Sequence, residues 1–272
     1  MQYEEISLWT KLATDSVLKR YQPPDRAVRP ALLVVPGGGY GCVCEETEGY
    51  PIAEHFAGLG FQVFHLKYRV HPNLYPAPQQ DLARAIRLIR RHADAWQVIP
   101  DQLAICGFSA GGHLCACAGT ISAELPTQDG DQPDTECARP NALILCYPVI
   151  TFGPFAHIGS GKNLLGERFD ELATTFSLEN QVTSNTPPTF LWHTIEDQVV
   201  PYQNSLLFAE AMVKQKRPCE VHLFPSGQHG MQLGYGRKDI GLWPQMARNF
   251  LISTCGFSLN TDFHSFKLTL NS

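Results

Sequence analysis

Ser109 stands between two glycines in the stretch ICGFSAGGHL, residues 105–114. The pentapeptide GFSAG fits the pattern G-x-S-x-G, with an apolar, strand-like run before it and a helix-like run after it. A free serine hydroxyl is a weak nucleophile and needs a neighbouring base to take its proton. The alternative interpretation is a tight turn that happens to contain a serine. The strand–turn–helix context favours a nucleophile held out at a sharp turn.

An acid and a base follow later in the chain, each in a loop after a strand-like run. Asp197 lies in TFLWHTIEDQVVP, and His229 lies in the glycine-flanked loop FPSGQHGM. A buried carboxylate can hold a histidine in the tautomer that acts as a base. Glu196 competes for the role of the acid, but a solvated loop charge describes it better. The order Ser109, Asp197, His229 is the nucleophile–acid–base order of α/β-hydrolases, and it differs from the chymotrypsin and subtilisin orders.

Three consecutive glycines, in LLVVPGGGYG, follow an early apolar run. Glycine lets backbone N–H groups approach a developing oxyanion without a side chain in the way. We therefore expect an oxyanion hole made by the N–H groups of Gly38 and Gly39, together with the N–H of Ala110 after the nucleophile. A phosphate-binding loop is the alternative. It is disfavoured because no Lys-Ser/Thr pair follows and because Cys42 takes the last position of G-x-G-x-x-G.

The remaining histidines and the nine cysteines do not form a pattern that binds a metal. No H-x-x-x-H, H-E-x-x-H or C-x-x-C spacing occurs, so the sequence predicts neither a metal site nor another cofactor. We expect the cysteines to be small buried hydrophobes in a reducing compartment. We expect His113 to pack in the core behind the sharp turn, or elbow, at Ser109. His65, His157 and His193 could line a pocket, although no spacing requires it.

Strand-like and helix-like segments alternate along the chain. A short, fully apolar run is typical of a strand buried on both faces, and apolar residues at helical spacing indicate a helix packed against it. Alternation of the two predicts βαβ units and a mostly parallel sheet with helices on both faces, which is the α/β class and the α/β-hydrolase fold. The expected strands cover residues 31–35, 61–69, 102–108, 142–149, 189–194 and 219–224, and the expected helices cover 50–60, 78–96, 110–123, 201–216 and 241–254.

The sequence shows no internal repeat and no linker long enough to divide it. We therefore expect one domain over residues 1–255, with cap-like insertions near 121–140 and 151–186 that border the substrate site. The tail, residues 256–272, alternates Phe266, Leu268 and Leu270 with polar residues. It predicts either an extra edge strand or an oligomer contact that would make a homodimer, and a frayed terminus is the alternative.

Composition limits the classes of partner. The 272 residues carry a formal net charge of −5, with 44% hydrophobic and 17% charged residues, which favours a globular core over disorder. The absence of a basic run argues against nucleic acid or an anionic membrane as the main partner. The N-terminus lacks a signal-peptide pattern, and no apolar run approaches the roughly 20 residues needed to span a bilayer. We therefore expect a cytoplasmic protein acting on a small-molecule substrate.

Several motifs, taken together, resemble a known family. They are PGGGY, EGYPIAEHFAGLGFQVFHLKYRV, YPAPQQDLARAIRLIRRHA, GFSAGGHL, CYPVITF, GSGKNLLG and HTIEDQVVPYQNS, spread over residues 25–254. In this combination they are similar to the small bacterial α/β-hydrolases described as acetyl-xylan-esterase-like or sugar esterases. That group is related to the lipases and esterases with a triple-glycine oxyanion loop.

The resemblance implies a cytoplasmic carboxylesterase acting on short acyl esters, above all acetyl esters, of sugars or xylo-oligosaccharides. Carried over by position, Ser109, Asp197 and His229 form the triad. Gly38, Gly39 and Ala110 supply the oxyanion N–H groups, as the residues themselves predict. One departure is visible, because the larger lipase-type relatives have histidine where this chain has Pro36. The small-esterase group shares that proline, so it does not indicate lost activity.

Other functions fit parts of the pattern. A prolyl-oligopeptidase-like serine peptidase has the same triad order, but too few residues precede the first strand for its large gating domain. A catalytically silent binding protein on the same fold is disfavoured because every triad member is present. A dienelactone-type hydrolase would need a cysteine as nucleophile, and Cys106 lies three residues too early, inside the strand.

Overall fold

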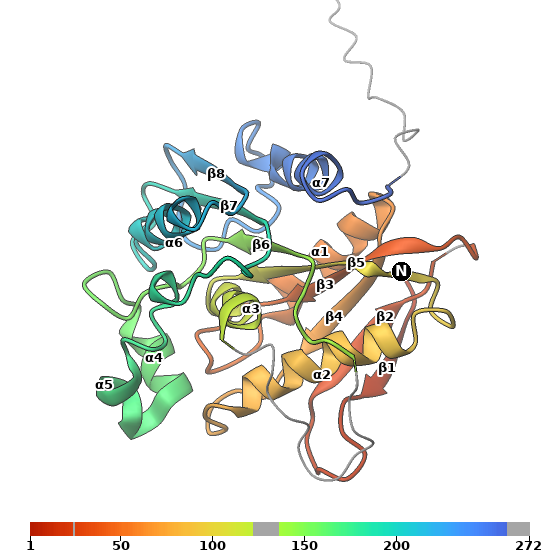
Figure 1. Cartoon of the computed structure of the whole chain (residues 1–272), viewed down its shortest axis with the longest axis horizontal. Coiled ribbons are helices and arrows are strands. Elements are labelled where there is room, and N and C mark those ends of the chain that lie inside the picture. The colour runs from red at the N-terminus through yellow and green to blue at the C-terminus, as the bar shows by residue number, and fades with distance from the viewer. Residues whose placement is uncertain (24, 122–135, 260–272) are drawn as a thin grey trace, which may run out of the picture.

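A computed structural model describes residues 1–23, 25–121 and 136–259. Its centre is an eight-stranded sheet in the order β1-β2-β4-β3-β5-β6-β7-β8 (Figure 1). β1 and β2 pair antiparallel, as do β2 and β4, and every other neighbouring pair is parallel. The strands are β1 (Tyr3–Ser7), β2 (Val17–Tyr21), β3 (Arg29–Val35), β4 (Gln62–Lys67), β5 (Val98–Phe108), β6 (Ala142–Cys146), β7 (Thr189–Thr194) and β8 (Cys219–Phe224).

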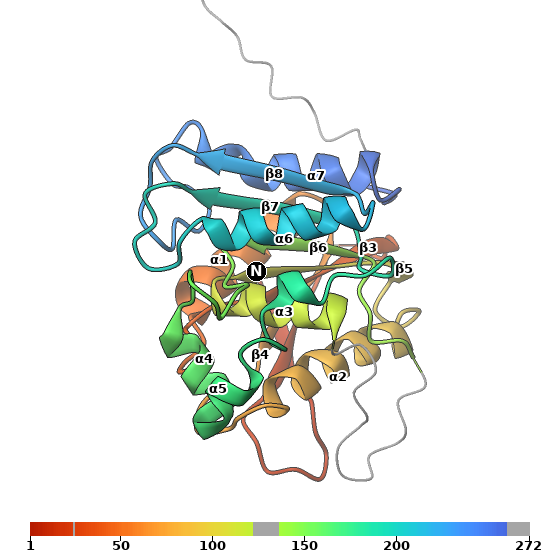
Figure 2. The same ribbon diagram turned by 60° about the vertical axis from the view of Figure 1, so that its left-hand side comes forward.

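Helices cover both faces of this sheet (Figures 1 and 2). α2, α3 and α6 pack on one face and α1 and α7 on the other, so the buried apolar residues form two clusters. The predicted α/β-hydrolase class is therefore confirmed. The helices are α1 (Tyr50–Gly58), α2 (Ala77–Arg91), α3 (Ala110–Thr120), α4 (Ile158–Leu165), α5 (Phe169–Leu172), α6 (Gln203–Lys214) and α7 (Trp243–Ser253), with short turns η1 (Glu45–Gly49), η2 (Gly166–Arg168), η3 (Leu178–Asn180) and η4 (Ile240–Leu242).

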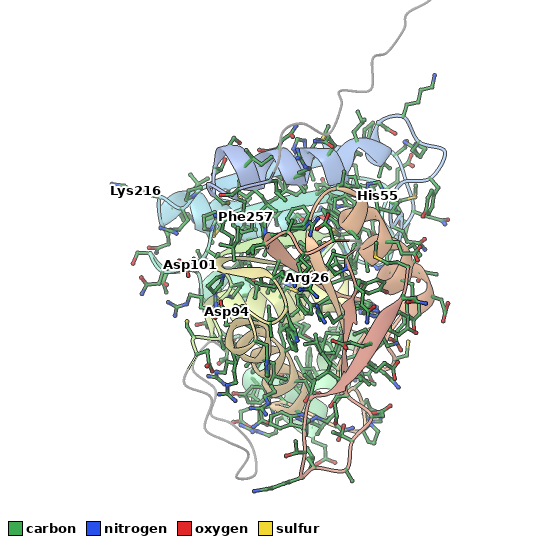
Figure 3. The ribbon with its side chains drawn as sticks, turned by 90° about the vertical axis from the view of Figure 1, so that its right-hand side faces the viewer. Arg26, His55, Asp94, Asp101, Lys216 and Phe257 are labelled. Carbon is green, nitrogen blue, oxygen red and sulfur yellow. The ribbon has the colours of Figure 1, made fainter. Side chains whose placement is uncertain are left out.

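The two clusters follow from the alternation of side chains along each strand. In β3, Leu33 and Val35 point into the cluster under α2 and α3, whereas Leu32 and Val34 point into the cluster under α1 and α7. Phe257, just after α7, adds to the second cluster (Figure 3). A strand buried on both faces must be apolar at every position, which is why β3 is a continuous apolar run.

The observed elements differ from the expected ones at their ends and at one edge. β7 and β8 have the predicted bounds, but β6 ends at Cys146 because Tyr147 has φ +38° and leaves the strand. α2 ends at Arg91 rather than at residue 96. β1 and β2 were not predicted. They are short, and β1 exposes alternate residues, so its pairing depends on contact with β2.

The segment 151–186 contains α4, α5, η2 and η3, and no strand. α4 and α5 lie on the side of the molecule toward which β7 and β8 point (Figure 2). Residues 122–135, most of the other expected insertion, lie outside the described residues, as do Phe266, Leu268 and Leu270 of the tail.

All nine cysteines are free thiols. The expectation of buried cysteines is confirmed for Cys106, Cys115, Cys117 and Cys146 and is wrong for the exposed Cys42 and Cys137. None of the helices within the described ranges is long and apolar enough to cross a membrane.

Candidate active site

The carboxyl ends of the parallel strands bring the candidate residues together. In open α/β sheets, ligands bind at this edge. Loops after β3, β5, β7 and β8 carry the glycine run, Ser109, Asp197 and His229 respectively. Residues 36–39 are called the oxyanion loop below, and residues 225–232 the histidine loop.

Ser109 occupies the turn between β5 and α3 with φ 52° and ψ −118°. A positive φ is unfavourable for a residue with a side chain and persists only where the surroundings enforce it. The Ser109 N–H donates to the Cys146 carbonyl at 3.0 Å, and the Val149 N–H donates to the Ser109 carbonyl at 3.1 Å. The end of β6 therefore fixes the turn, as expected for an elbow rather than an ordinary turn.

The two glycines around Ser109 are required by close approach. A Cβ on Gly107 would lie 2.4 Å from the Gly111 carbonyl oxygen, and a Cβ on Gly111 would lie 2.2 Å from the Val35 carbonyl oxygen. Backbone atoms cannot move aside as a flexible side chain can. The pattern G-x-S-x-G thus lets the end of β3 and the start of α3 meet beside the serine.

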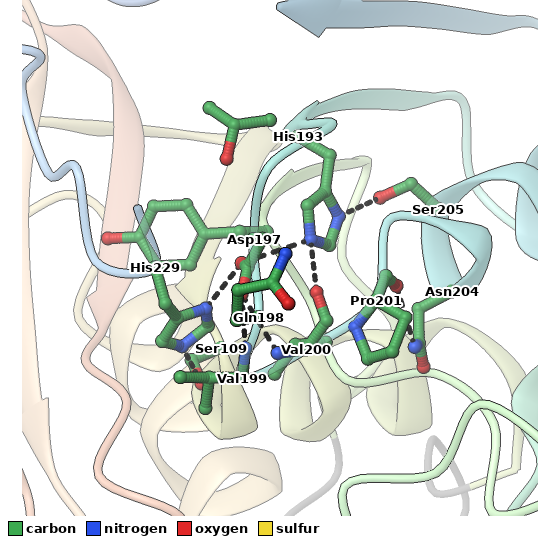
Figure 4. A network of polar contacts seen from close by, with 12 residues as sticks. Ser109, His193, Asp197, Gln198, Val199, Val200, Pro201, Asn204, Ser205 and His229 are labelled. Atoms are coloured by element: carbon green, nitrogen blue, oxygen red, sulfur yellow. Dashed lines mark hydrogen bonds and ion pairs between the residues drawn. The ribbon is translucent and has the colours of Figure 1, made fainter. Parts of the chain in front are cut away.

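His229 links Ser109 to Asp197 (Figure 4). His229 Nε2 lies 2.9 Å from Ser109 Oγ, and His229 Nδ1 lies 2.6 Å from Asp197 Oδ2. Because an ionised carboxylate only accepts hydrogen bonds, Nδ1 carries the proton and Nε2 is left to accept the serine hydroxyl. The structure therefore brings the three predicted residues into the geometry of a nucleophile, a base and an orienting acid.

A second histidine, His193, also contacts Asp197 (Figure 4). Asp197 Oδ1 accepts the N–H groups of Val199 and Val200, both at 2.9 Å, and His193 Nε2 lies 3.3 Å from Asp197 Oδ2. Burial would raise the pKa of the Asp197 carboxyl, but hydrogen bonds with His193, His229 and Val200 outweigh burial and hold that pKa well below its usual range. Asp197 is therefore ionised at neutral pH.

The oxyanion loop turns its carbonyls away from Ser109 and leaves two amides free. The Gly37 carbonyl accepts from Cys44 N at 3.0 Å, and the Gly39 carbonyl accepts from Asn163 Nδ2 at 2.9 Å. Within the described ranges, the N–H groups of Gly38 and Gly39 have no partner. Gly38 has φ +125°, and a Cβ there would lie 2.2 Å from the Cys42 carbonyl oxygen, so only glycine fits.

The third expected donor is at the start of α3. Ala110 is the first residue of that helix, so its N–H has no carbonyl one turn earlier to bond. The helix N-terminus also favours negative charge. Across the site, a Cβ built on Gly37 would lie 3.0 Å from Ser109 Cβ, so the oxyanion loop lies directly against the nucleophile.

Glu48 and Tyr147 form part of the site, although the sequence did not single them out. Glu48 is 6% exposed; its Oε2 accepts the Gly37 N–H at 2.8 Å and its Oε1 accepts the Tyr147 hydroxyl at 2.7 Å. The Tyr147 ring stands edge-on to His229, with centroids 5.0 Å apart. Glu48 lies in the run EETEGYP, where three acids look alike and nothing local distinguishes the buried one.

The other histidines have structural roles. His113 is fully buried between the Tyr40 hydroxyl and the Phe176 carbonyl, so the expectation that it packs behind the elbow is confirmed. His157 caps α4, and its Cε1 would lie 4.0 Å from a Cβ on Gly39. His65 is fully buried, with its Nε2 3.4 Å from Glu45 Oε2.

Glu196, the competitor for the acid, is exposed, and its carboxylate accepts the Gly227 N–H at 3.2 Å rather than a bond from His229. Among residues 1–23, 25–121 and 136–259, no group of three His, Cys, Asp or Glu side chains is arranged to hold a metal ion.

Comparison with known proteins agrees with this geometry. The family model described as BD-FAE matches residues 18–212. Endo-1,4-beta-xylanase B of Butyrivibrio fibrisolvens is 41% identical over 216 residues, covering 78% of this chain and 34% of that protein. The acetylxylan esterase of Xylanibacter ruminicola is 31% identical over 233 residues, covering 81% of this chain and 46% of that protein. The chain thus spans about a third to a half of the length of these relatives.

A solved structure is similar over nearly the whole chain. The acetyl ester-xyloside bifunctional hydrolase from Caldicellulosiruptor lactoaceticus has a TM-score of 0.85 and 38% identity, covering 92% of this chain and 96% of that one. The resemblance predicted from the motifs is therefore confirmed. With the sheet order and the family match taken together, this chain belongs to the BD-FAE family and has the α/β-hydrolase fold.

Proposed function

We propose that this protein is a serine carboxylesterase that removes short acyl groups, above all acetyl, from sugars or xylo-oligosaccharides. One observation carries the proposal. A hydrogen-bonded chain runs from Ser109 through His229 to the buried Asp197, beside two backbone amides that lack partners in the described part of the chain. That combination provides a nucleophile, a base and a place for an oxyanion.

The mechanism has two steps. Ser109 Oγ attacks the acyl carbonyl while His229 Nε2 takes its proton, and the N–H groups of Gly38, Gly39 and Ala110 hold the tetrahedral oxyanion. His229 then returns the proton to the leaving sugar oxygen, and the acyl group stays on the serine. Water, activated by His229, releases the acid in the second step. Asp197 orients the imidazole and stabilises its charged form.

Two observations support an acylated sugar as the substrate. The named relatives include an acetylxylan esterase and an acetyl ester-xyloside hydrolase. A hollow of about 710 Å³ borders the site at Asn163, which holds the Gly39 carbonyl. Five of the eight residues that line it have polar or charged side chains, which suits sugar hydroxyls: His71, Ile158, Lys162, Asn163, Gly166, Glu167, Phe169 and Asp170. Residues 1–255 would form one domain, whose insertion near 151–186 supplies all of this lining except His71.

The chemical test is acetate release from acetylated xylo-oligosaccharides, beside a p-nitrophenyl ester series of increasing acyl length. We expect acetyl esters to be preferred and Ser109→Ala to lower kcat by at least about a thousandfold. A preference for long acyl chains would overturn the sugar-acetyl assignment. Cleavage of peptides instead of esters would indicate the peptidase alternative, and inactivity with no covalent labelling of Ser109 would indicate a silent binding protein.

Location and assembly are further parts of the proposal. Nine free thiols, four of them buried, suit a reducing compartment, which supports a cytoplasmic location. A homodimer formed through the tail is tested by gel filtration of the full chain against a chain ending at Cys255. Equal apparent masses would contradict it. No nucleic acid, membrane or cofactor enters the proposed reaction.

A further inference from the structure

We propose that Glu48 is a positioning residue that joins the oxyanion loop to the histidine loop through Tyr147. The inference rests on the esterase function proposed above. It assigns a role to a buried carboxylate outside the triad. Glu48 fixes the position of the oxyanion loop relative to the histidine loop.

The connection is a continuous set of hydrogen bonds. On one side, Glu48 Oε2 accepts the Gly37 N–H at 2.8 Å. On the other, Glu48 Oε1 accepts the Tyr147 hydroxyl at 2.7 Å, and that hydroxyl in turn accepts the Gln232 N–H at 3.2 Å. Gln232 lies three residues after His229. A single carboxylate therefore links the loop expected to bind the oxyanion with the loop that carries the base.

The backbone at these junctions is strained. Ser109, Tyr147 and Gln232 have φ values of 52°, 38° and 52°, and none of them is glycine. Such conformations persist only when surrounding contacts enforce them, and they cluster at functional sites. The Tyr147 N–H bonds the Trp192 carbonyl at 2.8 Å, and Trp243 Nε1 bonds the Gln232 carbonyl at 2.8 Å. Two of these three positions, Tyr147 and Gln232, are joined directly through the Tyr147 hydroxyl that Glu48 accepts.

Glu48 and Ser109 both lie close to Gly37 and restrain its position. A Cβ on Gly37 would lie 2.8 Å from Glu48 Oε2 and 3.0 Å from Ser109 Cβ. Gly37 therefore has no room for a side chain beside the Glu48 carboxylate and Ser109. With its N–H held by Glu48 and its carbonyl by Cys44 N, the following amides of the loop remain available to an oxyanion.

Both Glu48 oxygens accept hydrogen bonds and neither donates one, which is the pattern of an ionised carboxylate. Burial raises the pKa of Glu48, while the bonds from Tyr147 and Gly37 and the charge of His229 oppose that rise. Burial raises the pKa of each of the other titratable neighbours of Glu48, so they stay neutral at pH 7: Cys44, Tyr68, Cys146 and Tyr147. An ionised Glu48 therefore has one acceptor oxygen for each of the two loops.

Two variants break the link from its two sides. Glu48→Gln keeps the size and an acceptor for Gly37, but puts an amide NH2 where an oxygen accepts the Tyr147 hydroxyl. Tyr147→Phe removes the hydroxyl and keeps the ring. Tyr21→Phe is the matched control, because Tyr21 is 2% exposed and its hydroxyl has no partner among the described residues. The measurements are kcat and KM for an acetyl ester, circular dichroism, and the rate of fluorophosphonate labelling.

We expect Glu48→Gln to lower kcat by about 10- to 100-fold and Tyr147→Phe by about 5- to 50-fold, since small misplacements of reacting groups have effects of this size. KM should change by less than about threefold in both, because substrate binding is not their task. The fold-loss in kcat of the double variant should be far smaller than the product of the two single losses, because both substitutions break the same link. Tyr21→Phe should keep wild-type kcat.

The split between kcat and KM distinguishes positioning from simple structural support. Both single variants should lower kcat and leave KM nearly unchanged, whereas a general loosening of the fold would raise KM as well. If Glu48→Gln fails to fold by circular dichroism, Tyr147→Phe and its kcat still test the link.

Wild-type kcat in both folded variants, multiplicative losses in the double variant, or a KM that rises as much as kcat falls would overturn the inference. A wild-type protein with neither esterase activity nor labelling at Ser109 would instead overturn the proposed function, and this inference with it. The two failures are therefore distinguishable.

Discussion

His229 sits between a hydroxyl and a carboxylate, and this placement fixes its tautomer. Its Nδ1 bonds Asp197 and its Nε2 bonds Ser109. His193 is more deeply buried, and each of its ring nitrogens also has a hydrogen-bond partner. Its Nε2 lies 2.9 Å from the Val200 carbonyl, which can only accept, and its Nδ1 lies 2.8 Å from Ser205 Oγ. His193 thus supports the acid, not the nucleophile.

Asp197→Asn tests the acid at the scale of one residue. The amide can no longer hold the His229 tautomer that accepts the serine proton, so we expect kcat to fall by about 10³–10⁴-fold. Glu196→Gln is the neighbouring control; it keeps an acceptor for Gly227 and should stay within about twofold of wild type. Steady-state kinetics on p-nitrophenyl acetate make the comparison. Equal losses in the two variants would contradict the assignment of the acid.

The sequence predicts the site residues that belong to a recognisable local motif. Ser109 has its glycines, and Asp197 and His229 each follow a strand, so all three were predicted and the structure brings them together. Glu48 and Tyr147 could not be found this way. They are 99 positions apart, and only the fold makes them neighbours.

Gly111 shows how elements, rather than single residues, build the elbow. The first turn of α3 packs against the end of β3, where a Cβ would meet two carbonyl oxygens, of Val35 at 2.2 Å and of Pro36 at 2.4 Å. The oxyanion loop begins at Pro36. The helix that carries the nucleophile and the loop expected to bind the oxyanion are therefore set relative to one another at this contact.

Gly111→Ala should separate these two elements. The added methyl group must push backbone atoms apart, so we expect the free energy of unfolding to fall by about 1–3 kcal/mol, together with a lower kcat. Gly58→Ala is the control, because a Cβ there meets nothing within 4 Å at the end of α1. It should change stability by less than about 1 kcal/mol. Urea unfolding and kinetics provide the measurements, and a stable, fully active Gly111→Ala would refute this account of the elbow.

At the element scale, periodicity predicted the parallel strands and failed at the edge formed by β1 and β2. β7 is a continuous buried run, and β8 is a half-buried run beside it, and the bounds of both are visible in the sequence. β2 contains the buried Lys19, whose ammonium pairs with Glu45 and Tyr50. A lysine in a short segment does not indicate a buried strand, because its partners become neighbours only in the fold.

The whole molecule buries histidine as well as apolar residues. His113 is fully buried, and its contacts suit the neutral ring, which can accept from the Tyr40 hydroxyl and donate to the Phe176 carbonyl. Burial lowers the pKa of His113 to about 4, outweighing the bond to the Phe176 carbonyl. An unfolded histidine titrates near ~6.5. Between these two pH values, unfolding takes up a proton.

Stability should therefore fall as pH decreases from about 6.5 toward 4, by an amount on the order of 2–3 kcal/mol from this residue. His113→Gln should lower stability at pH 7.5 but flatten that dependence. His92→Gln, at an exposed position, should leave it unchanged. Urea unfolding at pH 7.5 and pH 5 gives the comparison. An equally steep decline in His113→Gln would show that the buried ring does not cause it.

The central claim is that Ser109 is an activated nucleophile, and covalent labelling tests it most directly. The protein is incubated with a fluorophosphonate, digested, and mapped by mass spectrometry. The account predicts one adduct on the peptide that contains Ser109, none in Ser109→Ala, and much slower labelling in His229→Gln. An unlabelled wild-type protein, or a label that persists elsewhere in Ser109→Ala, would contradict it.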